Sequence, residues 1–417
     1  MRVETKKNLA RLAVKFGGSS LSSPQRISRA VDMVKREIDG GTQTAIVVSA
    51  MGRTTDDLLE TTSAVSLSNN TDQVDEVLSM GERTSGRIFN ATLSNRGVRS
   101  KYFDPDDDEW PIITDAKFGD STPILSTCQR RIQRHILSCL EDGIVPVLPG
   151  FVGRTKDGRI TTMGRGGSDV TAFLLARYLP ADECVLVTDS EGLMTADPKL
   201  IKNARPLPRV RIGEIFSLAD SGTKFLKSKA LQYMDDTFRV RITSNMARSL
   251  RSGGTLIIGG FPSALTAELE SPQPSMMVTI TGQNLSQNPR IMKDILSKIS
   301  AQRSRILGFS ANSNSLIIYL PCQRGRRLVK KIHESVLTHS EMTAMAVRNN
   351  LSLIRIVGFG LVETPGLIAT VSEPLRKSCL NLYGIFTIAS SIVLLVDWEH
   401  RQEALRLVQM SLRRVAA

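Results

Sequence analysis

Up to about Gly260 the chain alternates short apolar runs with amphipathic stretches, and this alternation leaves few folds open. We expect strands at Leu12–Phe16, Ala45–Ala50, Val98–Phe103, Ile144–Leu148, Cys184–Thr188 and Thr255–Ile258. These runs are rich in Val, Ile and Leu and are often apolar throughout, which is typical of parallel strands that helices cover on both faces. The pattern therefore predicts an α/β fold with a mostly parallel central sheet.

Capping and turn residues place the boundaries of several elements between these strands. Ser23-Pro24 predicts a helix start, because serine caps helices and proline fits their first position. Apolar residues then recur at helical spacing, at Ile27, Val31, Val34 and Ile38. A second helix is expected at residues 73–95, before a terminating Gly97. Asp157-Gly158 is expected at the tip of a hairpin.

A proline-containing segment divides the chain. Residues 261–275 contain three prolines, so we expect a first domain at 1–262 and a linker at 263–275. A β-α-β-β-α pattern follows at Met276–Thr281, Pro289–Ile299, Ile306–Phe309, Ser315–Leu320 and Arg324–Leu337. The pattern recurs at Ser352–Gly358, Pro365–Ser378, Leu380–Phe386, Ile392–Asp397 and Arg401–Leu412. The recurrence predicts a duplicated α+β module at 276–345 and 346–417, although chance similarity is the alternative.

The composition argues against membrane and disulfide-stabilised classes. The 417 residues suffice for two or three domains of roughly 100–200 residues each. No apolar run reaches the ~20 residues of a membrane span, and Met1–Lys7 has no apolar signal core, so we expect a cytoplasmic protein. The five cysteines are scattered and form no C-x-x-C pair, so we expect reduced thiols and neither a disulfide framework nor a zinc site.

The net charge of +13 raises the question of an anionic partner. Nucleic acid is one candidate, but polyphosphate substrates, or no specific partner, account for a basic surface equally well. The basic residues are spread along the whole chain, and aromatic residues make up only 5% of it, which leaves little for base stacking. Charge alone therefore gives nucleic-acid binding little support.

Two glycine-rich segments have the composition of an anion site. In Lys15-Phe16-Gly17-Gly18 a strand ends at paired glycines whose N–H groups can face an anion, and the lysine adds a positive charge. Residues 163–169 contain three glycines and Arg165, which suits a carboxylate or phosphate, before a helix that Ser168 caps. The first segment lacks the spacing of a Walker A loop. Each segment can also be an ordinary tight turn.

Three further segments carry weaker signals. Gly81 lies inside an expected helix, where glycine costs roughly 1 kcal/mol against alanine, so we expect close approach of another group and consider Glu82 a candidate ligand for an amine. Thr188 and Asp189 follow a strand end, where open α/β sheets bind ligands. Lys224 lies in a glycine-containing segment and is able to reach a phosphate. The alternatives are a solvated glutamate, a plain loop and a solvated lysine.

The sequence lacks the motifs of a histidine metal site and of a serine hydrolase, which excludes these two kinds of chemistry. The four histidines have no metal-ligand spacing, and no G-x-S-x-G elbow occurs. A carboxylate nucleophile, with a pKa near 4, is already ionised at neutral pH and needs no general base. A phosphoryl transfer to a carboxylate then requires only positioning and charge stabilisation from the protein.

Taken in order, these segments resemble the aspartate kinases of the amino-acid-kinase superfamily. The matching blocks are Lys15–Ser20, Ser49–Asp56, Gly81–Arg83, Gly150–Gly153, Gly164–Asp169, Thr188–Asp189 and Thr195–Pro198. The C-terminal repeats resemble paired ACT domains, most clearly at Glu363-Thr364-Pro365-Gly366. The resemblance covers nearly the whole chain. It implies an amino-acid-kinase fold followed by two ferredoxin-like ACT domains.

The resemblance also implies an activity and a set of site residues. The reaction is the ATP-dependent phosphorylation of the L-aspartate side-chain carboxylate to 4-phospho-L-aspartate, the first step toward lysine, threonine and methionine. Its implied catalytic residues are Lys15 and Asp169. Its implied substrate-binding residues are Ser19, Thr55, Glu82, Arg165 and Ser168. Its implied ATP-binding residues are Lys15, Gly17, Gly18, Thr188, Asp189, Met194, Lys199 and Lys224, with Mg²⁺ but no protein metal ligand.

The implied partners are an amino-acid effector, lysine or threonine, at the ACT domains and further copies of the chain in a dimer or larger homo-oligomer. No nucleic acid or membrane partner is implied. The chain departs from the family pattern at Ser19 (usually threonine), Met194 (commonly aromatic), Lys199 (frequently arginine), residues 225–229 (no His-Pro) and residues 286–290 (no Pro-Gly). These departures leave the catalytic residues in place and bear on adenine contacts and on feedback inhibition.

Two alternatives stay open. Glutamate 5-kinase and acetylglutamate kinase resemble the N-terminal part, but neither explains Glu82 together with the ACT pair. A catalytically silent amino-acid sensor built from the same parts is expected to lack Lys15, Arg165 or Asp169, and all three are present.

Overall fold

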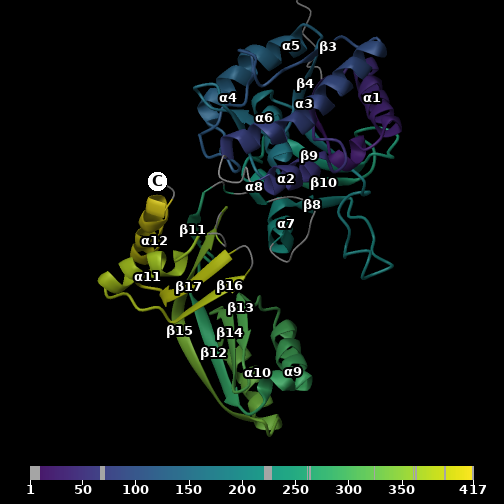
Figure 1. The fold of residues 1–417 in the computed structure, drawn as a ribbon. Helices are drawn as coiled ribbons and strands as arrows, with labels where there is room; N and C mark the ends of the chain where they lie inside the picture. The colour runs from purple at the N-terminus through teal and green to yellow at the C-terminus, as the bar shows by residue number, and fades with distance from the viewer. Residues whose placement is uncertain are drawn as a thin grey trace, which may run out of the picture. The chain divides into compact units, whose positions relative to one another are not determined.

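The computed structural model describes residues 10–65, 71–219, 228–260, 262, 264–323, 325–359, 361, 364–388 and 391–415. The chain divides into two compact units, Met1–Phe261 and Pro262–Ala417 (Figure 1). Among the described helices, none is long and apolar enough to cross a membrane.

The N-terminal unit is built on an eight-stranded sheet with the order β3-β4-β2-β1-β7-β9-β10-β8. Its strands are β1 (Arg11–Phe16), β2 (Gln43–Val48), β3 (Ser100–Tyr102), β4 (Val145–Pro149), β7 (Glu183–Thr188), β8 (Arg209–Arg211), β9 (Arg239–Ser244) and β10 (Thr255–Ile258). All neighbours pair in parallel except β9 and β10. The mostly parallel sheet confirms the predicted α/β fold.

Helices connect these strands and cover both faces of the sheet (Figure 1). They are α1 (Pro24–Asp39), α2 (Thr54–Ala64), α3 (Thr71–Asn95), α4 (Leu125–Arg131), α5 (Ser138–Glu141), α6 (Gly167–Tyr178), α7 (Ile212–Ala219) and α8 (Ser228–Leu231). The predicted caps are confirmed: the Ser23 hydroxyl accepts a hydrogen bond from the Arg26 N–H at 3.3 Å, and Gly97 has a φ of +77°. The predicted hairpin is the antiparallel pair β5 (Val152–Arg154) and β6 (Ile160–Thr162).

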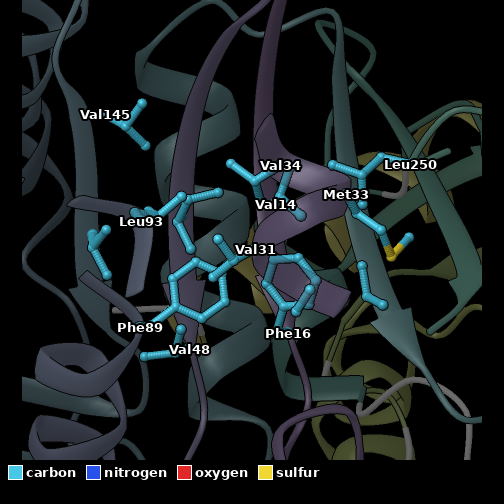
Figure 2. Close-up of a cluster of buried hydrophobic side chains, with 14 of the residues drawn as sticks. Val14, Phe16, Val31, Met33, Val34, Val48, Phe89, Leu93, Val145 and Leu250 are labelled. Carbon is cyan, nitrogen blue, oxygen red and sulfur yellow. The ribbon is translucent and has the colours of Figure 1, made fainter. Parts of the chain in front are cut away.

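Successive side chains of β1 point alternately into the hydrophobic core beneath α1 and α3 and toward the other face of the sheet. Val14 and Phe16 are fully buried beneath α1 and α3, and Figure 2 shows Phe16 beside Phe89 of α3, with ring centroids 5.3 Å apart. Because successive strand residues point to opposite faces, Lys15 faces the other side of the sheet, against which α6 packs. Alternation therefore directs a lysine toward the start of α6.

The C-terminal unit has a single seven-stranded sheet with the order β13-β14-β12-β15-β17-β16 and with β11 also paired to β15. The strands are β11 (Thr266–Leu269), β12 (Ser275–Gly282), β13 (Gly308–Ala311), β14 (Ser315–Pro321), β15 (Met342–Val357), β16 (Gly384–Ile388) and β17 (Ser391–Asp397). The helices are α9 (Pro289–Ala301), α10 (Gly325–Thr338), α11 (Leu367–Lys377) and α12 (Arg401–Val415).

The long strand β15 belongs to two ferredoxin-like modules. Its first part pairs with β12, while residues 351–357 pair with β17 and residues 354–357 also pair with β11. The orders β15-β12-β14-β13 and β11-β15-β17-β16 are the same arrangement, used twice. Each module buries its own apolar cluster beneath its own helices. The repeated arrangement confirms the two ferredoxin-like α+β modules that were predicted for this part of the chain.

Two boundary predictions need correction. Part of the expected linker at 263–275 is β11, which completes the second module by pairing with β15. The expected boundary between 345 and 346 lies inside β15, because one continuous strand serves both modules. Prolines and local periodicity could not indicate either feature, since each depends on pairing with a distant strand.

Candidate active site

A cavity of about 900 Å³ lies at the carboxyl ends of the parallel strands of the N-terminal unit. Its walls include residues that directly follow β1, β2, β4 and β7, the edge where open α/β sheets bind ligands. The predicted site residues that line it are Lys15, Gly17, Gly18, Ser19, Thr55, Glu82, Arg165, Ser168, Asp169, Thr188 and Asp189. The fold thus gathers these residues, which are far apart in sequence, around one space.

Lys15 and Asp169 form an ion pair in the lining of this cavity. The Lys15 Nζ lies 2.7 Å from the Asp169 Oδ1, and the side chains are only 16% and 14% exposed. Asp169 belongs to the first turn of α6, where a negative charge is favoured by the helix dipole. The pair therefore holds an ammonium group at a fixed position in a partly desolvated site.

The glycines after β1 allow the chain to pass close to neighbouring backbone. A Cβ on Gly18 would lie 2.7 Å from the Ala50 carbonyl oxygen, a distance that real Cβ atoms do not adopt. The Gly17 N–H donates to the Val187 carbonyl at 3.1 Å, and the Gly52 N–H donates to the Gly18 carbonyl at 3.0 Å. These bonds tie together the loops that follow β1, β2 and β7.

Glu82 is a buried carboxylate that faces the cavity from α3. It is 3% exposed, and its Oε1 accepts a hydrogen bond from the Thr55 hydroxyl at 3.4 Å. Its Oε2 is buried and has no hydrogen-bond partner among the described residues. Burial raises the pKa of Glu82 to about 7, against the opposing effect of hydrogen bonds from the Ala50 backbone and from Thr55. One carboxylate oxygen is therefore available to a donor in the cavity.

The glycine before this carboxylate explains its placement. A Cβ on Gly81 would lie 2.9 Å from the Ala50 Cβ, so a glycine is needed where α3 packs against the loop after β2. The close approach predicted from a glycine inside a helix is thus confirmed. Arg83, which follows Glu82, forms ion pairs with Glu76, Asp104 and Asp106 and does not line the cavity.

Arg165 supplies a cation to the same cavity. It is exposed, and within the described ranges it has no ion pair or side-chain hydrogen bond. The loop that carries it has two residues in the left-handed region, Gly164 at φ +66° and Gly166 at φ +89°. Ser168 follows at the start of α6 and is 8% exposed. An unpaired guanidinium in a cavity is suited to bidentate binding of a carboxylate.

Comparison with known proteins places this site in a family. A model of the amino acid kinase family matches residues 10–244. The chain belongs to the amino acid kinase family. It is 28% identical over 411 residues to the aspartokinase of Corynebacterium glutamicum, covering 95% of both chains. It is 27% identical over 417 residues to the aspartokinase of Thermus thermophilus, covering 97% of this chain and 98% of that one.

Solved structures agree on the fold of this family member. Aspartate kinase from Synechocystis has a TM-score of 0.80 at 22% identity, over 97% of this chain and 69% of that one. Escherichia coli aspartokinase III in complex with aspartate and ADP has a TM-score of 0.53 at 22% identity, over 97% of this chain and 100% of that one. At these identities the likeness concerns the fold alone.

Two predicted ATP-binding residues of this amino acid kinase do not line the cavity, and a third lies outside the described residues. Met194 lies outside the lining and pairs as an isolated bridge with Pro206. Lys199 is exposed, and its N–H donates to the Asp197 carboxylate at 2.9 Å. Lys224 lies outside the described residues, as does Glu363 of the second ACT module. The roles of these residues remain predictions.

Other cavity residues were not predicted as site residues. Phe151 follows β4 with a φ of +68°, a strained conformation for an aromatic residue, and lines the cavity. Asp75 of α3 is 1% exposed and also lines it. The Gly150–Gly153 block was the available signal for Phe151, and Asp75 had none. Among the described residues, no group of His, Cys, Asp and Glu is arranged to hold a metal ion.

Proposed function

We propose that this chain catalyses the ATP-dependent phosphorylation of the side-chain carboxylate of L-aspartate, giving 4-phospho-L-aspartate and ADP. The observation that carries the proposal is a carboxylate and a guanidinium in the walls of one cavity: the buried Glu82 Oε2, which has no hydrogen-bond partner among the described residues, and the exposed Arg165, which has no ion pair with them. An α-amino acid offers an ammonium and a carboxylate that complement both. Relatives named aspartokinase over nearly the full length support the same substrate.

In this proposal the cavity orients aspartate through the two charged groups on its α-carbon. Glu82 accepts hydrogen bonds from the α-ammonium, and Arg165 binds the α-carboxylate. Ser19, Thr55 and Ser168 supply hydroxyl groups around the remaining carboxylate, and all three line the cavity. The side-chain carboxylate then faces Lys15, with no need for a general base, because its own pKa keeps it ionised.

ATP is proposed to enter from the side of β7. Gly18 is proposed to offer its backbone N–H to the phosphates, whereas the Gly17 N–H is already bonded to the Val187 carbonyl, which leaves Gly17 only a role in letting the phosphates approach. Thr188 and Asp189 line the cavity where the nucleotide continues. Met194, Lys199 and Lys224 remain proposed contacts. Mg²⁺ is proposed to arrive bound to the ATP phosphates.

Lys15 and Asp169 are the proposed catalytic residues. The Lys15 ammonium stabilises the charge on the transferring γ-phosphoryl group, and Asp169 fixes that ammonium at 2.7 Å. The bond between the γ-phosphorus and the bridging oxygen of ATP breaks as the aspartate carboxylate oxygen bonds to phosphorus. The product is an acyl phosphate that water hydrolyses readily, so exclusion of water from the cavity is part of the mechanism.

The C-terminal modules are proposed to be regulatory, with residues 1–262 catalytic. Escherichia coli aspartokinase III has been solved in complex with lysine and aspartate, and it shares this fold with a TM-score of 0.52. Lysine or threonine is therefore the proposed effector, and a homo-oligomer the proposed assembly. A cytoplasmic location, and a place at the start of lysine, threonine and methionine synthesis, belong to the same proposal.

Hydroxylamine trapping of the acyl phosphate tests the proposal. L-aspartate, L-glutamate and N-acetylglutamate are incubated with the full chain, ATP and Mg²⁺. We expect hydroxamate from aspartate alone. Hydroxamate from glutamate or N-acetylglutamate instead would identify another carboxylate kinase of this fold, and none from any substrate in a folded, amino-acid-binding protein would favour the silent sensor.

A further inference from the structure

Residues 162–163, which lead into the Arg165 loop, are bonded to two charged side chains outside the proposed catalytic set. Asp75 of α3 contacts Thr162, and Lys229 of α8 contacts Met163. Each contact joins segments that are distant in sequence. The contacted residues, Thr162 and Met163, immediately precede the loop that carries Arg165, the proposed substrate-binding arginine.

Asp75 is a buried carboxylate that accepts three hydrogen bonds from two segments. Its Oδ2 accepts from the Gly119 N–H and the Thr162 N–H, both at 2.8 Å, and its Oδ1 accepts from the Thr162 hydroxyl at 2.6 Å. It has no ion pair with any described residue. Burial raises the pKa of Asp75, against the opposing effect of these donors. The carboxylate thus joins α3 to residues 119 and 162 through charge-assisted bonds.

Lys229 contacts the same region through different atoms. Its ammonium donates to the Met163 carbonyl at 2.7 Å and to the Ser121 carbonyl at 3.4 Å, and it pairs with Asp120. Its side chain is 21% exposed. Lys117 also pairs with Asp120, at 3.1 Å, but it is 67% exposed and contacts neither carbonyl. Only one of the two lysines therefore reaches the backbone before the Arg165 loop.

The segment 119–121 lies between these two charged groups. The Ser121 N–H and hydroxyl both donate to the Thr162 carbonyl, at 2.9 and 3.0 Å. The segment also abuts the loop itself, because a Cβ on Gly164 would lie 2.8 Å from the Asp120 Oδ1. Residues 119–121 therefore contact both Thr162 and Gly164, on either side of Met163 and next to Arg165.

We infer that Asp75 and Lys229 are positioning residues that clamp the Arg165 loop against α3 and so set the binding of the α-amino acid. Residues i and i+7 of a helix share a face, so Asp75 lies on the same face of α3 as Glu82. The clamp thereby fixes Arg165 relative to Glu82. This inference rests on the proposed function, in which these two residues bind the carboxylate and the amine of aspartate.

Lysine substitutions test one side of the clamp. Lys229→Met removes the donor to both carbonyls, and we expect the KM for aspartate to rise at least about tenfold, the value of one lost hydrogen bond between Arg165 and the α-carboxylate. The KM for ATP should stay within about twofold, because the clamp does not contact the phosphate-facing glycines. Lys229→Arg retains a donor and should restore most of the affinity. The matched control, Lys117→Met, loses only the outer pair with Asp120 and should leave both constants unchanged.

An aspartate substitution tests the other side. Asp75→Asn keeps the shape but places an amide NH₂ against backbone and hydroxyl donors, so we expect the same selective rise in the KM for aspartate. Asp72→Asn, an exposed change on the same helix, is its control. Hydrogen exchange of the amides of residues 162–167 in the ligand-free protein supplies a readout that needs no activity, and both clamp variants should accelerate it.

The outcomes separate the clamp from the proposed function. Wild-type activity on aspartate, with clamp variants that match their controls in KM and in exchange, would overturn the clamp and leave the function standing. A wild type that yields no hydroxamate would overturn the proposed function, while hydrogen exchange would still test the clamp. Faster exchange in Lys229→Met and Asp75→Asn than in their controls supports the clamp, and equal exchange refutes it.

Discussion

Replacing Glu82 by glutamine should stabilise the free protein and weaken its binding of aspartate. The carboxylate is 3% exposed, and its Oε2 has no partner among the described residues, so its charge is poorly compensated without substrate. A glutamine of the same shape keeps an oxygen for the Thr55 hydroxyl. It removes the charge that the proposed α-ammonium requires.

The magnitude follows from the pKa. Burial raises the pKa of Glu82 from 4.5 to about 7, and this difference of about 2.5 units corresponds to about 3 kcal/mol at 1.36 kcal/mol per unit. Between these values the folded protein holds more protons than the unfolded chain, so stability falls as pH rises. The advantage of Glu82→Gln should therefore be absent below about pH 4.5, grow between pH 4.5 and 7, and reach its full value above about pH 7.

Urea unfolding of both proteins at pH 5 and pH 8 measures this difference, and Glu60→Gln, an exposed change in α2, is the control. The kcat/KM for aspartate should fall about tenfold to a hundredfold in Glu82→Gln, the value of one hydrogen bond between charged groups. In the wild type, kcat/KM for aspartate should fall as pH drops below about 7. A variant that is less stable than the wild type at pH 8 would refute the reasoning.

Four other substitutions probe the site and the core. Lys15→Met and Asp169→Asn should each lower kcat by about 10² or more with little change in stability. Steady-state kinetics and thermal unfolding measure the two effects, and a loss of activity explained by unfolding of the variant would contradict the catalytic role. Gly81→Ala should raise the KM for aspartate, because its Cβ would lie 2.9 Å from the Ala50 Cβ; unchanged kinetics would refute this packing. Phe89→Ala should lower the free energy of unfolding by about 3–5 kcal/mol in urea titrations, since the ring is 1% exposed; a loss below about 1 kcal/mol would contradict its place in the core.

The sequence predicted those features of the fold that depend on local signals. Ser23 caps a helix and Gly97 ends one because capping requires only a few neighbouring residues. Strands such as β10, predicted and found at Thr255–Ile258, are marked by runs of apolar residues. By contrast, β11 forms because residues 266–269 pair with β15, whose matching residues lie about ninety positions away. No local pattern specifies such a partner.

The same limit applies to the site. A glycine inside a helix indicated the close approach at Gly81, and the adjacent Glu82 followed from the resemblance. Asp75 gave no comparable signal, because an acidic residue on a helix is usually solvated, and its donors at 119 and 162 are reached only in the folded structure. The strained Phe151 likewise follows from tertiary packing and not from its own preference.

The most direct test of the central claim is the identity of the hydroxamate formed from L-aspartate and ATP by the wild-type chain. Chromatography against the two authentic aspartyl hydroxamates distinguishes the side-chain product from the α-product. We predict the side-chain hydroxamate alone, formed in equal amount with ADP. The α-hydroxamate, or ADP release without any hydroxamate, would contradict it.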